Sequence, residues 1–151
     1  MPTVINGIED LKSRIGQHLG YSEYIVVTQD RINAFADATD DHQWIHVDEQ
    51  MAKSGPFGTT IAHGYLTLSL VPFLLKQVVS IEGVQMGVNY GANKIRFPSP
   101  VPVGSLIRLG ATLAGVEDIA GGVQILMEAT IEVEGAPKPS LVAELVYRYY
   151  V

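Results

Sequence analysis

The chain has 151 residues, 47% of them hydrophobic, and a net charge of −6 at pH 7. This length and apolar content predict one folded domain over residues 1–151 and exclude a disordered chain. The absence of cysteine excludes disulfides and thiolate catalysis, and the acidic balance argues against nucleic-acid binding, which requires a basic surface.

The first third of the chain predicts one short strand and two helices. Its N-terminal residues lack the basic and apolar regions of a signal peptide, so we expect a cytoplasmic protein. Residues 24–27 are rich in β-formers, and Thr28 can cap a helix that ends near Thr39, because apolar residues recur there at helical spacing. Asp48 can cap a short second helix over residues 49–53.

The most apolar stretch, from about Ile61 to Ile81, predicts a longer helix. This helix is apolar on nearly all sides, as expected of a helix surrounded by protein, and Pro72 should kink it or mark its end. Polar residues such as His63 and Lys76 interrupt the stretch, so we expect a buried core helix and no membrane partner.

From residue 84 onward the apolar period changes from about 3.6 to about 2, which indicates half-buried antiparallel strands. Turn signals divide this part into four long strands, over residues 84–97, 105–118, 122–134 and 140–150. One buried helix and one curved sheet predict an α+β fold, with an antiparallel sheet wrapped around a long central helix. The exposed sheet edges of such a fold favour a dimer or a higher homo-oligomer.

Asp41 and His46 form the most informative motif. They lie five positions apart, where a regular helix or strand would not aim them at one point, so only a loop can bring them together. Groups with unperturbed pKa values of roughly 3.9 and 6.5 can share a water molecule and move protons in both directions. The alternatives are a turn carboxylate and a core histidine. Asp40 is interpreted as a turn residue.

His63 and Gly64 stand near the start of the predicted core helix, where unpaired N–H groups collect. The N–H of Gly64 is a candidate oxyanion donor, because the missing Cβ permits a carbonyl to approach closely. The alternative is a glycine required by packing between helix and sheet. The His63 side chain is interpreted as structural, with a hydrogen bond to the Asp41 loop.

The segment from His42 to His46 also has the spacing of the H-E-x-x-H zinc motif. Gln43 replaces the catalytic glutamate of that motif, and the preceding helix should already have ended. We therefore expect no metal.

These motifs resemble the MaoC-like dehydratases, the (R)-specific enoyl-CoA hydratase family with the hotdog fold, and within it the subgroup related to nodulation protein N. The sequence departs from the family by carrying Gln43-Trp44 in place of Asn-Pro. The resemblance is carried by residues 35–41, by Ile45-His46, by Ala62-His63-Gly64, and by residues 89–98 and 100–104.

The resemblance implies a single MaoC-like hotdog domain that adds water to trans-2-enoyl-CoA, giving (R)-3-hydroxyacyl-CoA, or runs the reverse dehydration. Asp41 and His46 would handle the water, with their acid and base roles left open, and the N–H of Gly64 would bind the thioester carbonyl. No cofactor is expected, because the thioester already acidifies C2. Hotdog relatives pair their sheets edge to edge, which again implies a homodimer.

Further residues are candidates for binding the acyl-CoA substrate. Trp44, Phe57 and Tyr65 suit either the core or an acyl pocket. Lys94, Arg96 and Arg108 are cations available to CoA phosphates, with scattered surface charge as the alternative. The candidate substrate-binding residues, including those of the family-like segments, are Trp44, Phe57, His63, Tyr65, Asn93, Lys94 and Arg96.

Two other functions are compatible with this fold. Hotdog thioesterases commonly carry a carboxylate on or near the central helix, but residues 59–81 contain neither Asp nor Glu, which favours hydration. A non-catalytic acyl-thioester-binding protein is the second alternative, and the intact pair of Asp41 and His46 argues against it.

Overall fold

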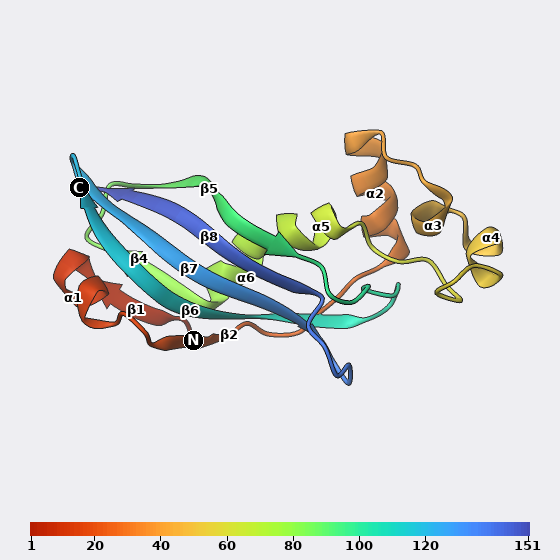
Figure 1. The fold of residues 1–151 in the computed structure, drawn as a ribbon, viewed down its shortest axis with the longest axis horizontal. Coiled ribbons are helices and arrows are strands. Elements are labelled where there is room, and N and C mark those ends of the chain that lie inside the picture. The colour runs from red at the N-terminus through yellow and green to blue at the C-terminus, as the bar shows by residue number, and fades with distance from the viewer.

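The computed structural model describes residues 1–151 and has an α+β architecture (Figure 1). As predicted, a curved antiparallel sheet wraps around a central helical segment, which here consists of two consecutive helices. The elements in chain order are β1 (Thr3–Asn6), α1 (Gly7–Ser13), β2 (His18–Tyr21), β3 (Ile25–Val26), α2 (Gln29–Thr39), α3 (Trp44–Val47), α4 (Glu49–Lys53), α5 (Gly64–Ser69), α6 (Val71–Val78), β4 (Val79–Glu82), β5 (Met86–Arg96), β6 (Leu106–Ile119), β7 (Gly122–Val133) and β8 (Leu141–Tyr150).

The main sheet has the strand order β2-β6-β7-β8-β5, and β3 also pairs with β6. Strands β5 to β8 confirm the four predicted long strands to within two residues at each end. Strands β6, β7 and β8 form an antiparallel meander, and β5 pairs with β8 alone. One edge of the sheet is therefore β5. Strands β1 and β4 form a separate parallel pair, which the sequence patterns did not indicate.

The predicted central helix begins later than expected and is divided in two. Residues before Gly64 are extended, because Ile61 bridges Pro102 and the N–H of Ala62 donates to the carbonyl of Val101 at 2.8 Å. The start predicted near Ile61 was therefore wrong. The break predicted from Pro72 is confirmed, since α5 ends at Ser69 and Pro72 lies in the first turn of α6, where its fixed φ is tolerated.

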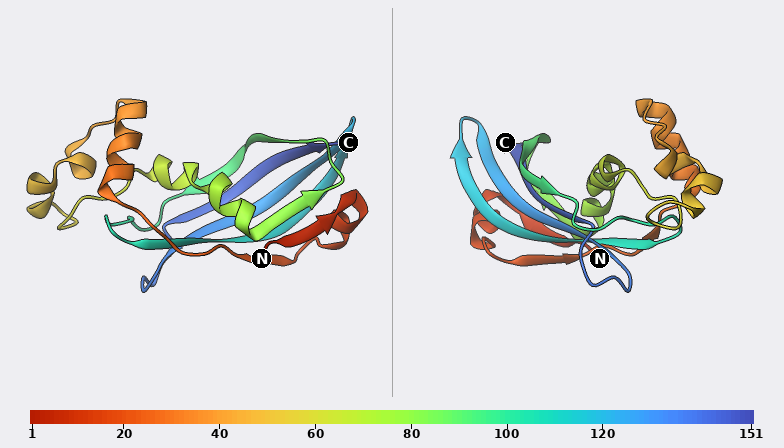
Figure 2. Two further views of the ribbon diagram at one scale, coloured as in Figure 1. Left: turned by 180° about the vertical axis from the view of Figure 1, so that it is seen from behind. Right: turned by 45° about the vertical axis from the view of Figure 1, so that its right-hand side comes forward.

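The core lies between these helices and the concave face of the sheet (Figure 2). Val71, Leu74 and Val78 of α6 are buried in one apolar cluster with the inward residues of β6 and β7. The alternation predicted for β7 is confirmed, because its buried residues are Val123, Ile125, Met127, Ala129 and Ile131. The start of α5 is thus attached to a well-packed frame.

Helices α2, α3 and α4 gather beyond one end of the sheet (Figure 1). The predicted caps of α2 and α4 are confirmed, because Thr28 accepts from the N–H of Arg31 at 3.1 Å and Asp48 accepts from the N–H of Met51 at 3.0 Å. Asp40 ends α2 in the left-handed conformation, with φ 60°, which confirms its role as a turn residue. The single turn of α3 was not predicted.

None of the helices combines the length and the apolar character needed to cross a membrane.

Candidate active site

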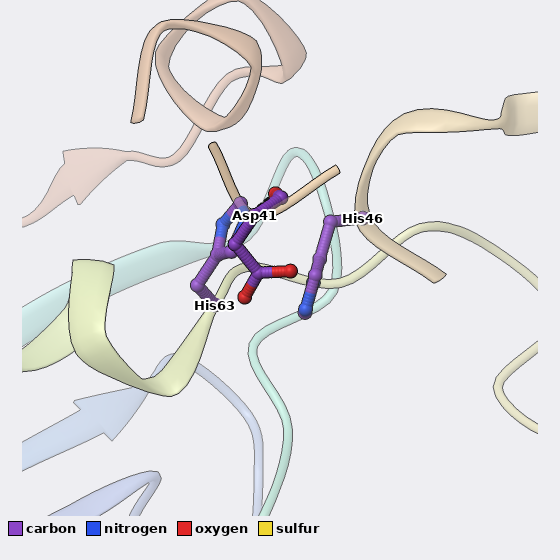
Figure 3. A group of neighbouring side chains, drawn as sticks. All are labelled: Asp41, His46 and His63. Carbon is purple, nitrogen blue, oxygen red and sulfur yellow. Dashed lines mark hydrogen bonds between the residues drawn. The ribbon is translucent and has the colours of Figure 1, made fainter. Parts of the chain in front are cut away.

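Asp41 and His46 meet at the break between α2 and α3. Asp41 lies in the connecting loop and His46 in the single turn of α3. A carboxylate oxygen of Asp41 and one ring nitrogen from each of His46 and His63 lie within 4.8 Å of one another (Figure 3). The structure therefore brings together three of the side chains that the sequence singled out, from segments on either side of α4.

The His46 ring is held by its main-chain surroundings. Its Nδ1 lies 2.7 Å from the carbonyl oxygen of Ile61, and only 7% of the residue is exposed. A carbonyl only accepts hydrogen bonds, so Nδ1 carries the proton and the neutral ring offers its lone pair at Nε2. Burial lowers the pKa of His46 and outweighs the opposing effects of the Ile61 carbonyl and of Asp41.

Gln29 and Thr60 support the main chain of His46. The amide nitrogen of Gln29 donates to the carbonyl of His46 at 2.8 Å, and the buried hydroxyl of Thr60 donates to the amide oxygen of Gln29 at 2.5 Å. Sequence reasoning did not single out either residue. A glutamine in the first turn of a helix usually faces solvent, and only its tertiary contacts show this role.

His63 touches both members of the pair. Its Nε2 lies 2.9 Å from the carbonyl oxygen of Asp41, in agreement with the predicted contact to the Asp41 loop. Its ring stacks on that of His46, with centroids 3.9 Å apart and an interplanar angle of 22°. Only 2% of His63 is exposed, and its Nδ1 has no hydrogen-bond partner.

A cavity of about 340 Å³ opens next to His46. Gly64 lines it as the first residue of α5, where helical N–H groups have no intrahelical acceptor. A Cβ at Gly64 would lie 3.1 Å from the ring of Phe97, so the missing side chain keeps this wall open. The main side chains around the cavity are those of His46, Phe57, Thr67, Phe97 and Ser140.

The aromatic candidates do not all reach this cavity. Phe57 lines it. Trp44 packs over Gly55, since a Cβ added there would lie 2.9 Å from the indole ring. Tyr65 is 69% exposed and meets Phe97 edge-on at a centroid distance of 6.3 Å. Of the three aromatic candidates, only Phe57 lines the cavity beside His46.

The polar candidates on β5 lie elsewhere. Lys94 and Arg96 line a separate hollow of about 280 Å³ that also contains Glu128 and Glu144, and Asn93 lines another. None of these three residues lines the cavity beside His46 of its own chain. Their contact with CoA stays a prediction.

The zinc-motif alternative finds no support in the placement of His42. Its Nε2 lies 2.9 Å from a carboxylate oxygen of Asp37, an interaction that raises the pKa of His42. His42 is therefore engaged with α2 and does not join His46. The spacing of Asp41, His46 and His63 would also suit a metal ion, and the prediction of a metal-free site is open to test by chelation.

Comparison with known proteins places the chain among related sequences. The family model described as MaoC like domain matches residues 10–136. The 3-hydroxyacyl-thioester dehydratase Z of Mycobacterium tuberculosis is 52% identical over 143 residues, which cover 94% of this chain and 95% of that protein. Nodulation protein N of Rhizobium leguminosarum bv. viciae is 45% identical over 139 residues, covering 90% and 86%.

Solved structures share the fold at lower identity. The monoamine oxidase regulatory protein from Archaeoglobus fulgius has a TM-score of 0.79 at 24% identity, covering 96% of this chain and 95% of that one. The (R)-hydratase from A. caviae has a TM-score of 0.73 at 22% identity, covering 88% and 94%. These likenesses establish the hotdog fold.

Proposed function

This chain belongs to the MaoC like domain family, and from that premise we propose that it is a hydro-lyase acting on acyl thioesters. It interconverts trans-2-enoyl and 3-hydroxyacyl thioesters, with acyl-CoA as the substrate class. The observation that carries the proposal is the meeting of Asp41 and His46 beside a cavity that Gly64 also lines. The dehydratase named above, at 52% identity, supports the same reaction class.

Hydration requires three contributions from these residues. Asp41 and the Nε2 of His46 hold one water molecule, whose oxygen bonds to C3 of the enoyl group. One proton of this water passes through the pair to C2, and the other stays on the new hydroxyl. Charge that develops on the thioester oxygen is stabilised by the N–H of Gly64, and a donor of this kind contributes about 3 kcal/mol. The thioester itself acidifies C2, so the reaction needs no cofactor.

The state of His46 favours one assignment of roles. Its lowered pKa keeps the imidazole neutral in the resting enzyme, with the lone pair at Nε2. A neutral imidazole has a free lone pair and can take a proton from the bound water. We therefore assign to His46 the removal of the proton from water in the hydration direction, and to Asp41 the orientation of that water and the transfer towards C2.

The R configuration of the product is the finer part of the proposal. Two solved structures with this fold are named as (R)-hydratases. Gly64 would fix the carbonyl while Asp41 and His46 hold the water, and these three points define one face of the enoyl group. Coupling the product to an S-specific 3-hydroxyacyl-CoA dehydrogenase should give no NADH, and stoichiometric NADH would overturn the R assignment alone.

We also propose a homodimer formed through β5. This strand pairs only with β8, and every residue of β5 except Ile95 is exposed. Its free edge presents unpaired main-chain groups next to exposed apolar side chains such as Met86 and Tyr90. Pairing with β5 of a second copy would give these main-chain groups hydrogen-bond partners and would bury the apolar side chains. Sizing in solution at micromolar concentration should give twice the chain mass of 16.4 kDa, and a monomer mass would contradict the dimer.

The experiment that tests the activity follows two signals at once. The protein is incubated with crotonyl-CoA and with longer trans-2-enoyl-CoAs while enoyl absorbance and free thiol are recorded. Loss of absorbance without free thiol is the expected result, and pretreatment with EDTA should leave the rate unchanged. Free CoA released in step with substrate loss would indicate a thioesterase, and binding without turnover would indicate a non-catalytic protein.

A further inference from the structure

His63 contacts both Asp41 and His46. It is the N-cap residue of α5 and is therefore attached to the packed core, whereas Asp41 and His46 belong to the helices beyond the end of the sheet. Its Nε2 lies 2.9 Å from the main-chain carbonyl of Asp41, and its ring covers the ring of His46 at 3.9 Å. Figure 3 shows the three side chains facing one another.

The contacts of His63 indicate which of its ring nitrogens carries a proton. A carbonyl oxygen accepts hydrogen bonds and donates none, so Nε2 carries the proton. Nδ1 then holds a lone pair, and it is buried without a partner. The His63 ring contacts the rings of Phe35 and His46, with centroids 4.9 Å and 3.9 Å away.

Few other contacts restrain Asp41. The residue is exposed, and its carboxylate accepts only a long hydrogen bond, 3.4 Å, from the N–H of Gln43. The hydrogen bond from His63 to the Asp41 carbonyl is therefore the tie between this loop and the core.

We propose that His63 is a positioning residue with two separable tasks. Its Nε2–H holds the Asp41 loop at working distance from His46, and its ring face shields His46 from water. The proposal rests on the hydratase activity proposed above, in which His63 itself exchanges no proton with the substrate.

The second task has a measurable consequence at His46. The titratable groups that face His46 are Asp41, from the loop after α2, and His63, from the start of α5. Desolvation is the largest cause of the lowered pKa of His46. Removing the aromatic cover should admit water to the ring and raise that pKa towards its ordinary value of about 6.5.

Three substitutions separate the two tasks. His63→Gln keeps an N–H donor near the position of Nε2 but removes the ring. His63→Phe keeps an aromatic cover but removes the donor. His63→Asn removes both, because its amide is too short to reach the Asp41 carbonyl. Gln and Asn are matched controls for each other, since both replace the imidazole by an amide.

We expect kcat to depend on whether residue 63 keeps an N–H donor, and the pKa of His46 to depend on whether residue 63 keeps an aromatic ring. We expect His63→Gln to retain kcat within about 3-fold, and His63→Phe and His63→Asn to lose 10-fold or more in kcat with little change in KM, the size of effect expected when a catalytic group is misplaced. Imidazole NMR should show the larger rise in the pKa of His46 in the Gln and Asn variants, and a smaller rise in the Phe variant, which keeps the ring cover and loses only the charge effect of His63.

Each result has a clear meaning. Wild-type kcat in His63→Phe, or equal losses in the Gln and Asn variants, would overturn the positioning of Asp41. The same pKa of His46 in all three variants would overturn the shielding, because only the Phe variant keeps the ring cover. The NMR titration needs no substrate, so it still tests the shielding if the wild-type protein proves inactive on enoyl thioesters, a result that would count against the proposed function instead.

Discussion

The side-chain amide of Gln29 donates a hydrogen bond of 2.8 Å to the main-chain carbonyl of His46. The same amide donates to the side chain of Asn33 at 2.9 Å, and its oxygen accepts from the buried hydroxyl of Thr60 at 2.5 Å. One side chain at the start of α2 thus links α3 to the extended segment that leads into α5.

Gln29→Met should lower kcat about 10-fold and the free energy of unfolding by about 1 to 2 kcal/mol. The substitution leaves the His46 carbonyl and the buried Thr60 hydroxyl without their partner, which carries a penalty of this size. Steady-state kinetics and denaturant titration measure the two effects. Asn33→Ala is the matched control, because it removes only the exposed contact of Gln29. Equal values of kcat and of the free energy of unfolding in the two variants would show that the hydrogen bond from Gln29 to His46 is not required.

Asp41→Asn and His46→Gln should each reduce kcat by about 100-fold or more, the usual range for losing a general acid or base. In the proposed mechanism both residues act on one water, so the double variant should lose much less than the product of the two single effects. Melting temperatures of the single variants should stay close to that of the wild type. A single variant with nearly normal kcat would refute the assignment of the pair.

Gly64→Ala should reduce kcat/KM by about 10-fold or more. The new Cβ would lie 3.1 Å from the Phe97 ring and would enter the cavity wall next to the proposed oxyanion donor. Gly115→Ala serves as the control, because a Cβ there meets its nearest neighbour, Leu126, at an ordinary 3.9 Å. If both variants kept full activity, Gly64 would be required neither for carbonyl access nor for the shape of the cavity.

Asp40→Gly should raise the free energy of unfolding by about 0.5 kcal/mol without a change in kcat. Asp40 ends α2 with φ 60°, a left-handed conformation that glycine adopts without the steric cost borne by other residues. Asp40→Val should have the opposite effect, since a β-branched side chain tolerates this φ least. Chemical denaturation of the three proteins gives the order, and greater stability of the Val variant would contradict it.

The free energy of unfolding of the wild type, taken relative to that of His46→Gln, should be lower at about pH 5 than at about pH 7.5. The folded protein lowers the pKa of His46, so below about 6.5 the unfolded chain binds a proton that the folded state resists. This residue therefore makes the wild type lose stability as the pH falls, and glutamine does not titrate. Denaturant titrations of both proteins at the two pH values measure the difference, and a constant difference would rule out the linkage.

The sequence predicted the sheet and the caps of α2 and α4 because those features depend on local patterns. Alternation along β7 and the capping residues Thr28 and Asp48 are set by neighbours in the chain. The start of the central helix was misplaced, because apolar residues at 61 and 62 suit a helix equally well. Tertiary hydrogen bonds to Val101 and the bridge to Pro102 decide that they are extended.

The candidate site was predictable in its named members and not in its supporting ones. Asp41, His46 and Gly64 are recognisable by spacing and by resemblance. Gln29 and Thr60 are ordinary polar residues whose role arises only when α2 and the segment before α5 meet. The orphaned nitrogen of His63 likewise has no sequence signature, because it results from the packing of rings around it.

Asp41 and His46 belong to the helices beyond the end of the sheet, whereas His63 and Gly64 belong to the start of α5. This division has a consequence for the order of unfolding. Helices α3 and α4 contact mainly α2 and each other, and α2 reaches the core through Ile32 and Phe35, while α5 and α6 share the core with the sheet. The outer helices can therefore open as a local unit while the sheet remains intact. Amide hydrogens of α2 to α4 should exchange with solvent faster than those of β6 and β7. Activity should disappear at a lower denaturant concentration than the native circular dichroism of the sheet.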